Sequence, residues 1–351
     1  KSHVESCIVR IMDRSLIRRT LFGFLLLIPV FGGLFLFIDV DRVLTALQQA
    51  EQTVVVFVLL TTVGWLFAWS LSLRTVLRTL TVSLSIPRSF FLFSGATFSN
   101  NVTPFGQAGG EPITAYLISK TSKTRYETGL AAIASVDTLN FVPSFLFAII
   151  GISYYAIALS LTSHMKLAAV LLGSLGLIIV GGGYYLWTSR SAIERYLSAG
   201  LTRVLRRVAS IVPRVSAPSR EAIMDRINHF TQTIERIGTN PIQLVVALGY
   251  SSAGWLFQAG ALWLAFYAIG ATIPFAVVLF AIPISAIAGV TPLPGGAGGI
   301  ESVLVALLVS TTSIESALIV AAVIIFRGIV YWVPTVIGGS VLAVVTARRV
   351  S

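Results

Sequence analysis

The chain has 351 residues, of which 56% are apolar and 11% are charged. Soluble domains carry roughly a quarter of charged residues, so this composition excludes a soluble protein. The net charge of +11 would suggest a nucleic-acid partner in a soluble protein. Here the basic residues lie between long apolar runs, so we expect no nucleic-acid partner. The single cysteine excludes an internal disulfide, and no Cys/His spacing is typical of a zinc site.

The apolar runs predict an all-α polytopic membrane protein, because a spanning helix needs roughly 20 apolar residues. In chain order we expect a basic N-terminus (1–20), a first span with its external loop (21–52), a first repeat (53–160), a linking span (161–187), an Arg-rich segment (188–241) and a second repeat (242–347). Two regions rich in Gly and Pro, 90–119 and 275–310, interrupt the repeats and predict re-entrant hairpins.

The basic residues orient these segments, because short cytoplasmic loops collect Lys and Arg. The N-terminal stretch, the segment 188–241 and the C-terminal Arg348 and Arg349 are all basic, which places both termini in the cytoplasm. The first hairpin is flanked by Arg88 and Lys120, so we expect it to enter and leave through the cytoplasmic face. The sequence therefore predicts a multi-pass protein of the cytoplasmic membrane.

Short motifs recur in the same order at a nearly constant offset, which indicates an internal repeat. The matches pair Gly64–Phe67 with Gly254–Phe257 (offset 190), Thr103-Pro104 and Gly109–Glu111 with Thr291-Pro292 and Gly298–Glu301 (near 188), Glu127–Leu130 with Glu315–Leu318 (188), and Val142-Pro143 with Val333-Pro334 (191). Each half thus reads span, re-entrant hairpin, span, and the linking span inverts the second half. Inverted repeats with paired Gly/Pro-interrupted segments are typical of transporters with a site near the midplane.

The hairpin loops carry the predicted translocation site. Prolines end helices and glycines permit positive φ, so both loops should present backbone N–H groups where the returning half-helix begins. Such N-termini attract anions such as phosphate. The alternative is a tight turn that only allows close packing. From these loops the predicted site takes Asn101, Thr103, Gly109, Gly110, Glu111, Thr291, Pro292, Gly295, Gly296, Gly298, Gly299 and Glu301.

Four charged residues at membrane depth complete the site. Glu111 and Glu301 follow the glycines at equivalent places, where carboxylates are functional candidates by default. They suit proton carriers, partners of a buried cation, or caps of the half-helix N-termini. Asp137 and Arg327 lie inside corresponding spans, and we expect the inverted fold to bring them near a shared axis. They form either a structural ion pair or a site where Arg327 binds a lipid phosphate. In the second case, Asp137 or a glutamate would balance Arg327 when the site is empty.

The Arg-rich segment 188–241 has apolar residues at helical spacing opposite its arginines. This pattern predicts an interfacial amphipathic helix on the anionic cytoplasmic leaflet. A second helix over about 220–237 is expected to pair with it as a hairpin. A solvated linker that obeys the positive-inside rule is the alternative.

The second loop, Thr291-Pro292-Leu293-Pro294-Gly295-Gly296-Ala297-Gly298-Gly299-Ile300-Glu301, resembles the flippase-like membrane domain of lysylphosphatidylglycerol synthases, and so does the later Phe326-Arg327-Gly328…Tyr331-Trp332-Val333-Pro334. The resemblance covers about 21–345. In full-length synthases a soluble aminoacyl transferase domain follows the membrane part, and this sequence lacks it. The resemblance therefore implies a stand-alone member that translocates lipid.

The sequence contains no nucleophile–base pair, P-loop, Rossmann fingerprint or metal cluster, so we expect neither an enzyme nor a bound cofactor. The leading hypothesis is a flippase that moves an anionic or phosphate-bearing lipid headgroup through a midplane cavity between the repeats. The alternatives are a secondary transporter of a small soluble anion and a membrane scaffold for a lipid-modifying enzyme. An anionic phospholipid or a polyprenyl-phosphate-type lipid is the expected partner. The sequence leaves open a lipid-modifying enzyme and a homo-oligomer as further ones.

Overall fold

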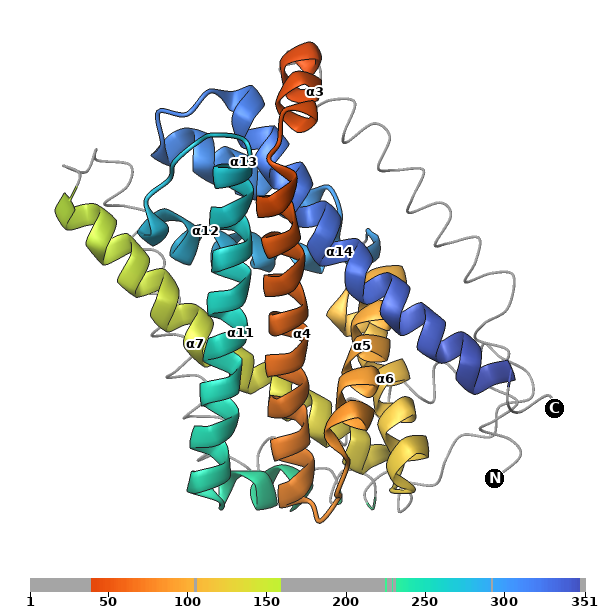
Figure 1. The fold of residues 1–351 in the computed structure, drawn as a ribbon. Helices are drawn as coiled ribbons and strands as arrows, with labels where there is room; N and C mark the ends of the chain where they lie inside the picture. Colours follow the sequence, from red (N-terminus) through yellow and green to blue (C-terminus); the bar gives the residue numbers. More distant parts are fainter. Residues whose placement is uncertain are drawn as a thin grey trace, which may run out of the picture.

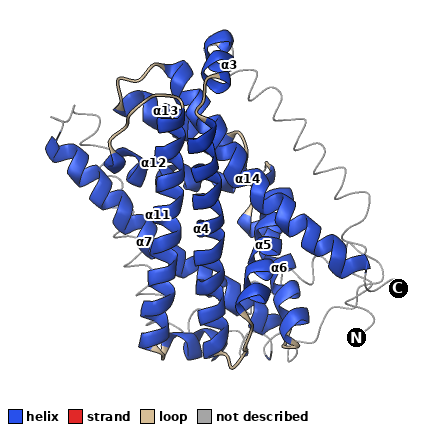
Figure 2. Ribbon diagram, viewed as in Figure 1, coloured by secondary structure: helices blue, strands red, loops and turns tan. Residues whose placement is uncertain are grey.

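The computed structural model describes residues 39–103, 106–158, 225, 229, 232–291 and 293–347. The expected basic N-terminus, first span, linking span and most of the Arg-rich segment lie outside these residues. Within the described part every regular element is a helix, which agrees with the all-α expectation (Figures 1 and 2).

The described helices fall into two sets of four, after a short helix α3 (Val40–Gln48). The first half consists of α4 (Gln52–Thr79), α5 (Ile86–Val102), α6 (Gln107–Ser122) and α7 (Tyr126–Ala158). The second half consists of α11 (Pro241–Ala268), α12 (Phe275–Ile287), α13 (Gly299–Thr311) and α14 (Ser316–Ala347), with two 3₁₀ turns, η1 (Ala288–Val290) and η2 (Pro294–Gly296), between α12 and α13.

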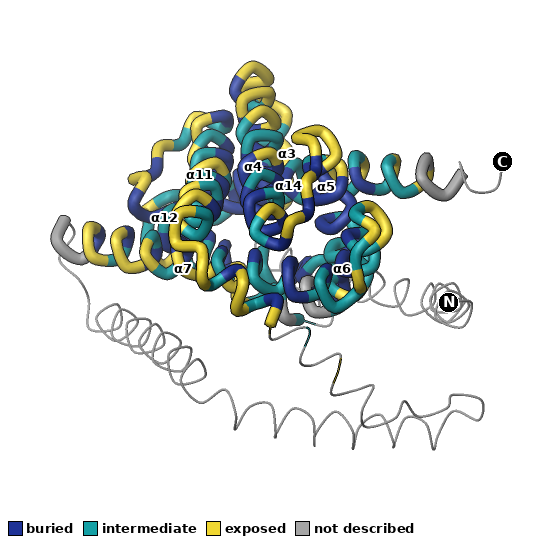
Figure 3. Tube along the Cα trace, turned by 90° about the horizontal axis from the view of Figure 1, so that it is seen from below, coloured by how far each residue is buried: buried dark blue, intermediate teal, exposed yellow. Residues whose placement is uncertain are grey.

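By length and composition, four stretches of the described part are long and apolar enough to cross a membrane: Gln52–Thr79, Tyr126–Tyr155, Pro294–Thr311 and Ser316–Ala343. The helix α11 has 28 residues, as many as α4. Large apolar side chains remain exposed on the outer faces of the long helices, for example Phe141 and Ile150 on α7 and Val245 on α11. Figure 3 shows buried residues where the helices meet and exposed residues outside. The chain is therefore a multi-pass membrane protein, with these exposed faces turned to lipid.

The helices α4 and α11 stand side by side and antiparallel in the middle of the molecule (Figure 1). Gly64 of α4 faces Phe257 of α11, and a Cβ at Gly64 would lie 2.9 Å from the Phe257 ring. Likewise, Gly254 of α11 lies against the indole of Trp69 of α4. Small residues let helix backbones approach closely in a membrane, and each glycine of the repeated Gly-Trp-Leu-Phe motif lies against an aromatic ring of the other helix.

Polar contacts fix this α4–α11 contact in register. The Trp69 indole N–H donates to the Ser251 carbonyl at 3.1 Å, and the Ser72 hydroxyl donates to the Ala247 carbonyl at 3.1 Å. The ring of Trp69 also packs edge-on against Trp255, with centroids 5.6 Å apart. Buried indole and hydroxyl groups need a partner where water is absent, so these bonds specify which residues of the two helices meet.

The remaining helices pack crosswise between the halves. The helix α5 packs on α14 and α12 packs on α7, while α6 packs on α7 and α13 on α14. Exchanging α4 with α11, α5 with α12, α6 with α13 and α7 with α14 maps this set of neighbours onto itself. Glycines allow the closest approaches: a Cβ at Gly151 of α7 would lie 2.6 Å from the Ala276 carbonyl of α12.

The short helix α3 lies where the sequence predicts an external loop. Asp39 caps it by accepting the backbone N–H of Arg42 at 3.2 Å, and Val43 and Ala46 are buried. The Arg42 guanidinium also donates to Glu315, just before α14. The N-cap and the two buried apolar residues three positions apart are a signal for a helix in the sequence.

Candidate functional site

The ends of the two helix pairs α5–α6 and α12–α13 touch each other. Gly106 (φ +52) starts the turn into α6, and a Cβ there would lie 3.1 Å from the Gly289 carbonyl of η1. Gly295 (φ +59) of η2 lies against Asn101 of α5, whose Cα would be 3.2 Å from a Cβ. Positive φ and the absence of a Cβ are both needed here, which explains the glycines.

Asn101 links the first helix pair to α14. Its side-chain amide donates to the Tyr331 carbonyl at 3.1 Å and to the Thr335 hydroxyl at 2.8 Å. The Tyr331 hydroxyl donates back to the Asn101 carbonyl at 2.9 Å. Sequence reasoning missed Tyr331 and Thr335, although their spacing of four and eight residues from Arg327 places all three on one face of a helix.

A buried ion pair joins α13 to α14. Arg327 Nε donates to Glu301 Oε1 at 2.6 Å, and the two side chains are only 13% and 12% exposed. The second oxygen of Glu301 accepts the Gly298 backbone N–H at 2.6 Å at the start of α13. An Arg327 Nη2 approaches the Gly295 carbonyl at 3.5 Å. The guanidinium thus lies at the point where α13, η2 and α14 meet.

This arrangement bears on the predicted anion site at the start of α13. Glu301 already occupies one backbone N–H and neutralises Arg327, so a phosphate must share or displace this carboxylate. A guanidinium carries five N–H donors. Within the described part of the chain, only two Arg327 nitrogens meet an acceptor. The remaining donors are the group that an incoming phosphate oxygen would meet.

Asp137 and Arg327 do not pair, contrary to the simplest expectation from the sequence. No ion pair joins them in the described part, and Arg327 contacts Glu301 instead. Glu111 and Glu301 are 190 residues apart, and so are Asp137 and Arg327. Glu301 therefore contacts the residue 26 positions later, in the long helix of its own half.

The other predicted site residues lie around these contacts. Thr103 is buried, and its hydroxyl donates to the Ser99 carbonyl at 2.7 Å. A Cβ at Gly110 would lie 2.6 Å from the Asn100 nitrogen. Close approaches of this kind also hold Gly296 against Gly289 and Gly299 against Thr291. Gly109 follows Gly106 in the first turn of α6, and Pro292 lies outside the described residues.

Several buried polar atoms near the helix-pair ends have no hydrogen-bond partner. On the first half these are Asn100 Oδ1, Thr114 Oγ1 and Asp137 Oδ2. In the second half, the Thr291 hydroxyl likewise has no hydrogen-bond partner within the described part of the chain. Buried polar atoms are normally paired, so each of these exceptions calls for an explanation such as a bound water or ion. Thr114 is a residue that sequence reasoning missed, because a threonine in the middle of an apolar helix is common.

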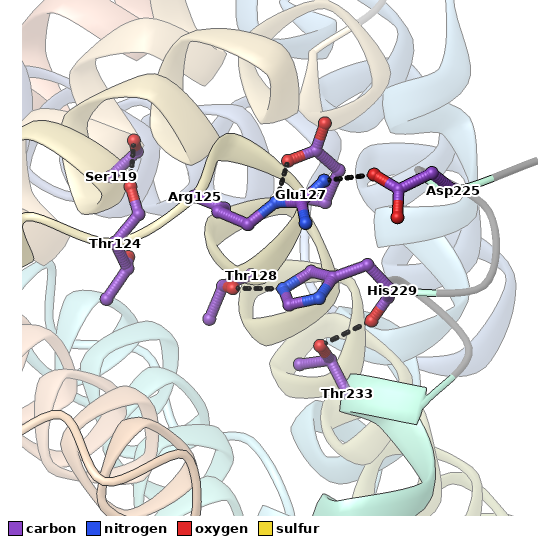
Figure 4. Close-up of polar contacts among 8 residues, drawn as sticks. All are labelled: Ser119, Thr124, Arg125, Glu127, Thr128, Asp225, His229 and Thr233. Atoms are coloured by element: carbon purple, nitrogen blue, oxygen red, sulfur yellow. Dashed lines mark hydrogen bonds and ion pairs between the residues drawn. The ribbon is translucent and has the colours of Figure 1, made fainter. Parts of the chain in front are cut away.

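Two residues of the Arg-rich segment contact the corner between α6 and α7 (Figure 4). Arg125 Nη2 donates to Asp225 Oδ2 at 2.8 Å, and the Thr128 hydroxyl lies 3.0 Å from His229 Nε2. The hydrogen bond that Arg125 donates to Asp225, with the charge of that carboxylate, raises the pKa of Arg125 above its ordinary value. Part of the segment is therefore attached to the protein at this corner.

Comparison with known proteins identifies the family of this chain. The family model described as the lysylphosphatidylglycerol synthase TM region matches residues 20–338. A UPF0104 membrane protein of Methanothermobacter thermautotrophicus is 27% identical over 280 residues, which is 78% of this chain and 78% of the relative. A UPF0104 membrane protein of Pyrococcus horikoshii is 25% identical over 307 residues, 86% of this chain and 89% of the relative.

The family match spans the α4–α11 contact, both helix pairs and the buried Glu301–Arg327 pair, and therefore covers every element of the candidate site. The sequence resemblance to the membrane part of these synthases is thereby confirmed. The chain belongs to the lysylphosphatidylglycerol synthase TM region family.

Proposed function

We propose that this protein translocates a lipid with an anionic or phosphate-bearing headgroup across the cytoplasmic membrane. The headgroup would pass between the two halves at the touching ends of the helix pairs, while the acyl chains stay in the bilayer. The family, named for the membrane part of a lipid-modifying enzyme, supports a lipid as the substrate.

The observation that carries this proposal is the buried Glu301–Arg327 pair beside the junction of the halves. A charged pair at membrane depth is costly, and such residues mark substrate pathways more often than structural contacts. Arginine presents a planar fork of donors that matches a phosphate with two parallel hydrogen bonds. We assign Arg327 the role of phosphate anchor and Glu301 the role of its partner when no lipid is bound.

The proposed route follows from inverted repeats with re-entrant hairpins, in which α5–α6 and α12–α13 enter from opposite faces. The exchange of each first-half helix with its second-half counterpart preserves the packing neighbours, and α4 runs antiparallel to α11, which supports this topology. In such proteins one half rocks against the other around a fixed site. The passage would open when Gly106 and Gly295 part from Gly289 and Asn101.

The test is lipid translocation in proteoliposomes. Fluorescent phosphatidylglycerol in the outer leaflet is bleached by a membrane-impermeant reductant, and protected lipid reports movement. We expect wild-type protein to move the probe, and Arg327→Gln to abolish this movement. Unchanged movement by Arg327→Gln would overturn the phosphate-anchor role.

A matched control is Arg42→Gln, which removes an arginine from another Arg–Glu pair at the outer end of α14. This variant loses the same charge away from the helix-pair ends, so it should translocate as the wild type does. The neutral double variant Glu301→Gln/Arg327→Gln removes the buried charges together and should also be inactive. Its inactivity would show that loss of the Arg327 anchor, and not burial of an unpaired Glu301 carboxylate, stops lipid movement.

The same vesicles distinguish the alternatives left open by the sequence. Counterflow of a labelled soluble phosphate or carboxylate, with no movement of the lipid probe, would favour a secondary transporter of small anions. Movement of neither, together with capture of a lipid-modifying enzyme that depends on Asp225 and the rest of 188–241, would favour the scaffold.

A further inference from the structure

The long helices α7 and α14 each contain a proline in their interior, Pro143 and Pro334, at equivalent places of the repeat. A proline removes one backbone N–H and disturbs the turn before it, and in a membrane neighbouring elements satisfy the carbonyls of that turn. Asn140 and Tyr331 lie three residues before these prolines, and the carbonyl of each accepts a side-chain N–H from the other half. These two carbonyls are therefore points where the long helices are fastened across the junction of the halves.

The helix α7 is fastened by α11. The Trp255 indole N–H donates to the Asn140 carbonyl at 2.9 Å. One turn earlier on α11, the Ser251 hydroxyl donates to Asn140 Oδ1 at 2.5 Å. All three residues are buried. Because buried polar groups cannot turn to water instead, these two bonds hold α11 to α7.

The equivalent residues of α4 bond differently. The offset of 190 that relates the two Gly-Trp-Leu-Phe motifs makes Trp65 the counterpart of Trp255, and Thr61 the counterpart of Ser251. The Trp65 indole N–H is buried and has no hydrogen-bond partner within the described part of the chain. The Thr61 hydroxyl donates to carbonyls of its own helix. The helix α4 nevertheless packs against α14, as α11 packs against α7.

A different residue holds the Tyr331 carbonyl of α14. It accepts the Asn101 amide of α5 at 3.1 Å and the Thr335 hydroxyl at 2.5 Å. The Tyr331 hydroxyl strengthens the contact by donating to the Asn101 carbonyl at 2.9 Å. Because a carbonyl oxygen has two lone pairs, a third side-chain donor can bind only after one of these two leaves.

We propose that the described conformation is one of two alternating states, and that Trp65 and Trp255 are the latches that distinguish them. In the described state Trp255 holds α7. In the other state the Asn101 amide is released, and the Trp65 N–H donates to the Tyr331 carbonyl instead. At the same time Trp255 leaves Asn140. This inference rests on the inverted repeats of the proposed function, because exchanging the conformations of two inverted halves turns one state into the other.

The ring of Trp69 links the two latches. It packs edge-on against both Trp65 and Trp255, with centroids 5.4 and 5.6 Å from its own. Protein interiors are close-packed and transmit displacement from one side chain to the next. Movement of one outer ring therefore displaces the other, so that one indole is captured as the other is released.

The latches are tested without transport by the indole N–H NMR spectrum of ¹⁵N-tryptophan protein in nanodiscs. The chain has six tryptophans, whose signals single Trp→Phe variants assign. A hydrogen-bonded indole proton resonates downfield of an unbonded one, so in the wild type Trp255 should give a bonded signal and Trp65 an unbonded one. Trp255→Phe removes one hydrogen bond from the described state and should raise the ratio of bonded to unbonded Trp65 about fivefold.

Two further variants sharpen this measurement. Asn101→Leu frees the Tyr331 carbonyl and should move the Trp65 signal in the same direction as Trp255→Phe does. Trp263→Phe is the matched control, because it also removes an indole N–H from α11. Trp263 donates to the Ile273 carbonyl within its own half at 3.1 Å, so its loss should leave the Trp65 signal unchanged. Thermal unfolding midpoints check that each variant is folded.

An unchanged Trp65 signal in folded Trp255→Phe protein would overturn the proposal. If Trp255→Phe does not fold, the Asn101→Leu result decides in the same way. Bonded signals for Trp65 and Trp255 together in the wild type would also overturn it, because the two latches would then not alternate. A Trp65 signal that moves equally in the Trp263→Phe control would show a general loosening of α11 and would count against the latches.

The role in transport is tested in the translocation assay. Trp255→Phe weakens the latch that holds the described state, so it should raise the initial rate of probe movement by up to about fivefold. Trp263→Phe should leave the rate unchanged. Alternating indole signals without any lipid movement would reject the proposed function and retain the latches. A rate at or below that of the wild type in folded Trp255→Phe protein would reject the role of the latches in transport and retain the translocase.

Discussion

The two halves of this protein place charged side chains at equivalent positions and pair them differently. In the second half, Glu301 faces Arg327 at 2.6 Å. In the first half, Glu111 and Asp137 have the same spacing of 26 residues, and within the described part of the chain neither forms an ion pair with a basic residue. The difference resides in one residue of each long helix, Asp137 in α7 and Arg327 in α14.

This comparison shows that residues at equivalent places in the two halves need not make equivalent contacts. The arginine in α14 gives Glu301 an opposite charge to pair with, whereas the residue at the same offset in α7 is an acid. The difference is visible only when both halves are set side by side.

The largest effect on the difference between the two halves is expected from neutralising Arg327. Arg327→Gln leaves Glu301 ionised and buried without a partner, which should reduce the free energy of unfolding by about 3–5 kcal/mol. The measurement is a denaturant titration in mixed micelles. The double variant Glu301→Gln/Arg327→Gln should recover most of this loss, and a double variant as unstable as the single one would show that the charge pair is not the cause.

The second test addresses the contact that holds the halves together. Gly254→Ala places a Cβ against the Trp69 indole and should destabilise the protein by about 1–3 kcal/mol through overpacking. Gly249→Ala on the same helix meets nothing within 4 Å and should be neutral or stabilising by up to about 1 kcal/mol. The measurement is the thermal unfolding midpoint of both variants. Equal midpoints would mean that α4 and α11 do not pack as described.

The third test neutralises the first-half counterpart of Arg327. Asp137 forms no ion pair within the described part of the chain, so Asp137→Asn removes no attraction between opposite charges, and the free energy of unfolding should change by no more than about 1 kcal/mol. The same titration as for Arg327→Gln gives the measurement. A loss as large as that of Arg327→Gln would indicate that Asp137 is an ionised structural partner, and the two halves would then be alike in their electrostatics.

The smallest expected effect concerns the corner between α6 and α7. Arg125 and Asp225 are 47% and 66% exposed, so salt should screen their contact. Asp225→Asn should speed hydrogen exchange at this corner at low salt and leave lipid movement unchanged. Glu315→Gln, which breaks the Arg42 contact at the other end of the molecule, serves as control. Protection that is unaffected by Asp225→Asn would mean that the segment is held by other contacts.

The long apolar helices and the Gly/Pro-rich interruptions could be predicted from the sequence, because both are local signals. The glycines at 106, 295, 296 and 298 do adopt positive φ, as the loop motifs indicate. The sequence left the partner of Arg327 open between Asp137 and a glutamate, and the structure selects Glu301. Spacing along the chain identifies equivalent residues, but which of them touch depends on how the halves cross in space. The helix α3 was missed for a different reason, since its charged sequence was assigned to an external loop.

The unsatisfied oxygens near Glu111 could not have been found from the sequence either. Whether Asn100 and Thr114 have partners depends on neighbours from other helices, and their residue types are common in ordinary helix contacts. The same is true of the Asn101–Tyr331 bonds, which join residues 230 positions apart.

The α4–α11 contact has a consequence for how the protein is made. The carbonyl that accepts the Trp69 indole N–H lies 182 residues later in the chain. At a synthesis rate of about 5–20 residues per second, α4 must wait roughly 10 to 40 seconds in the bilayer before that partner emerges from the ribosome. During this interval its indole and hydroxyl groups face lipid or a membrane chaperone. Substitutions in α4 would therefore first have an effect during synthesis and membrane insertion of the chain, before the fold is complete.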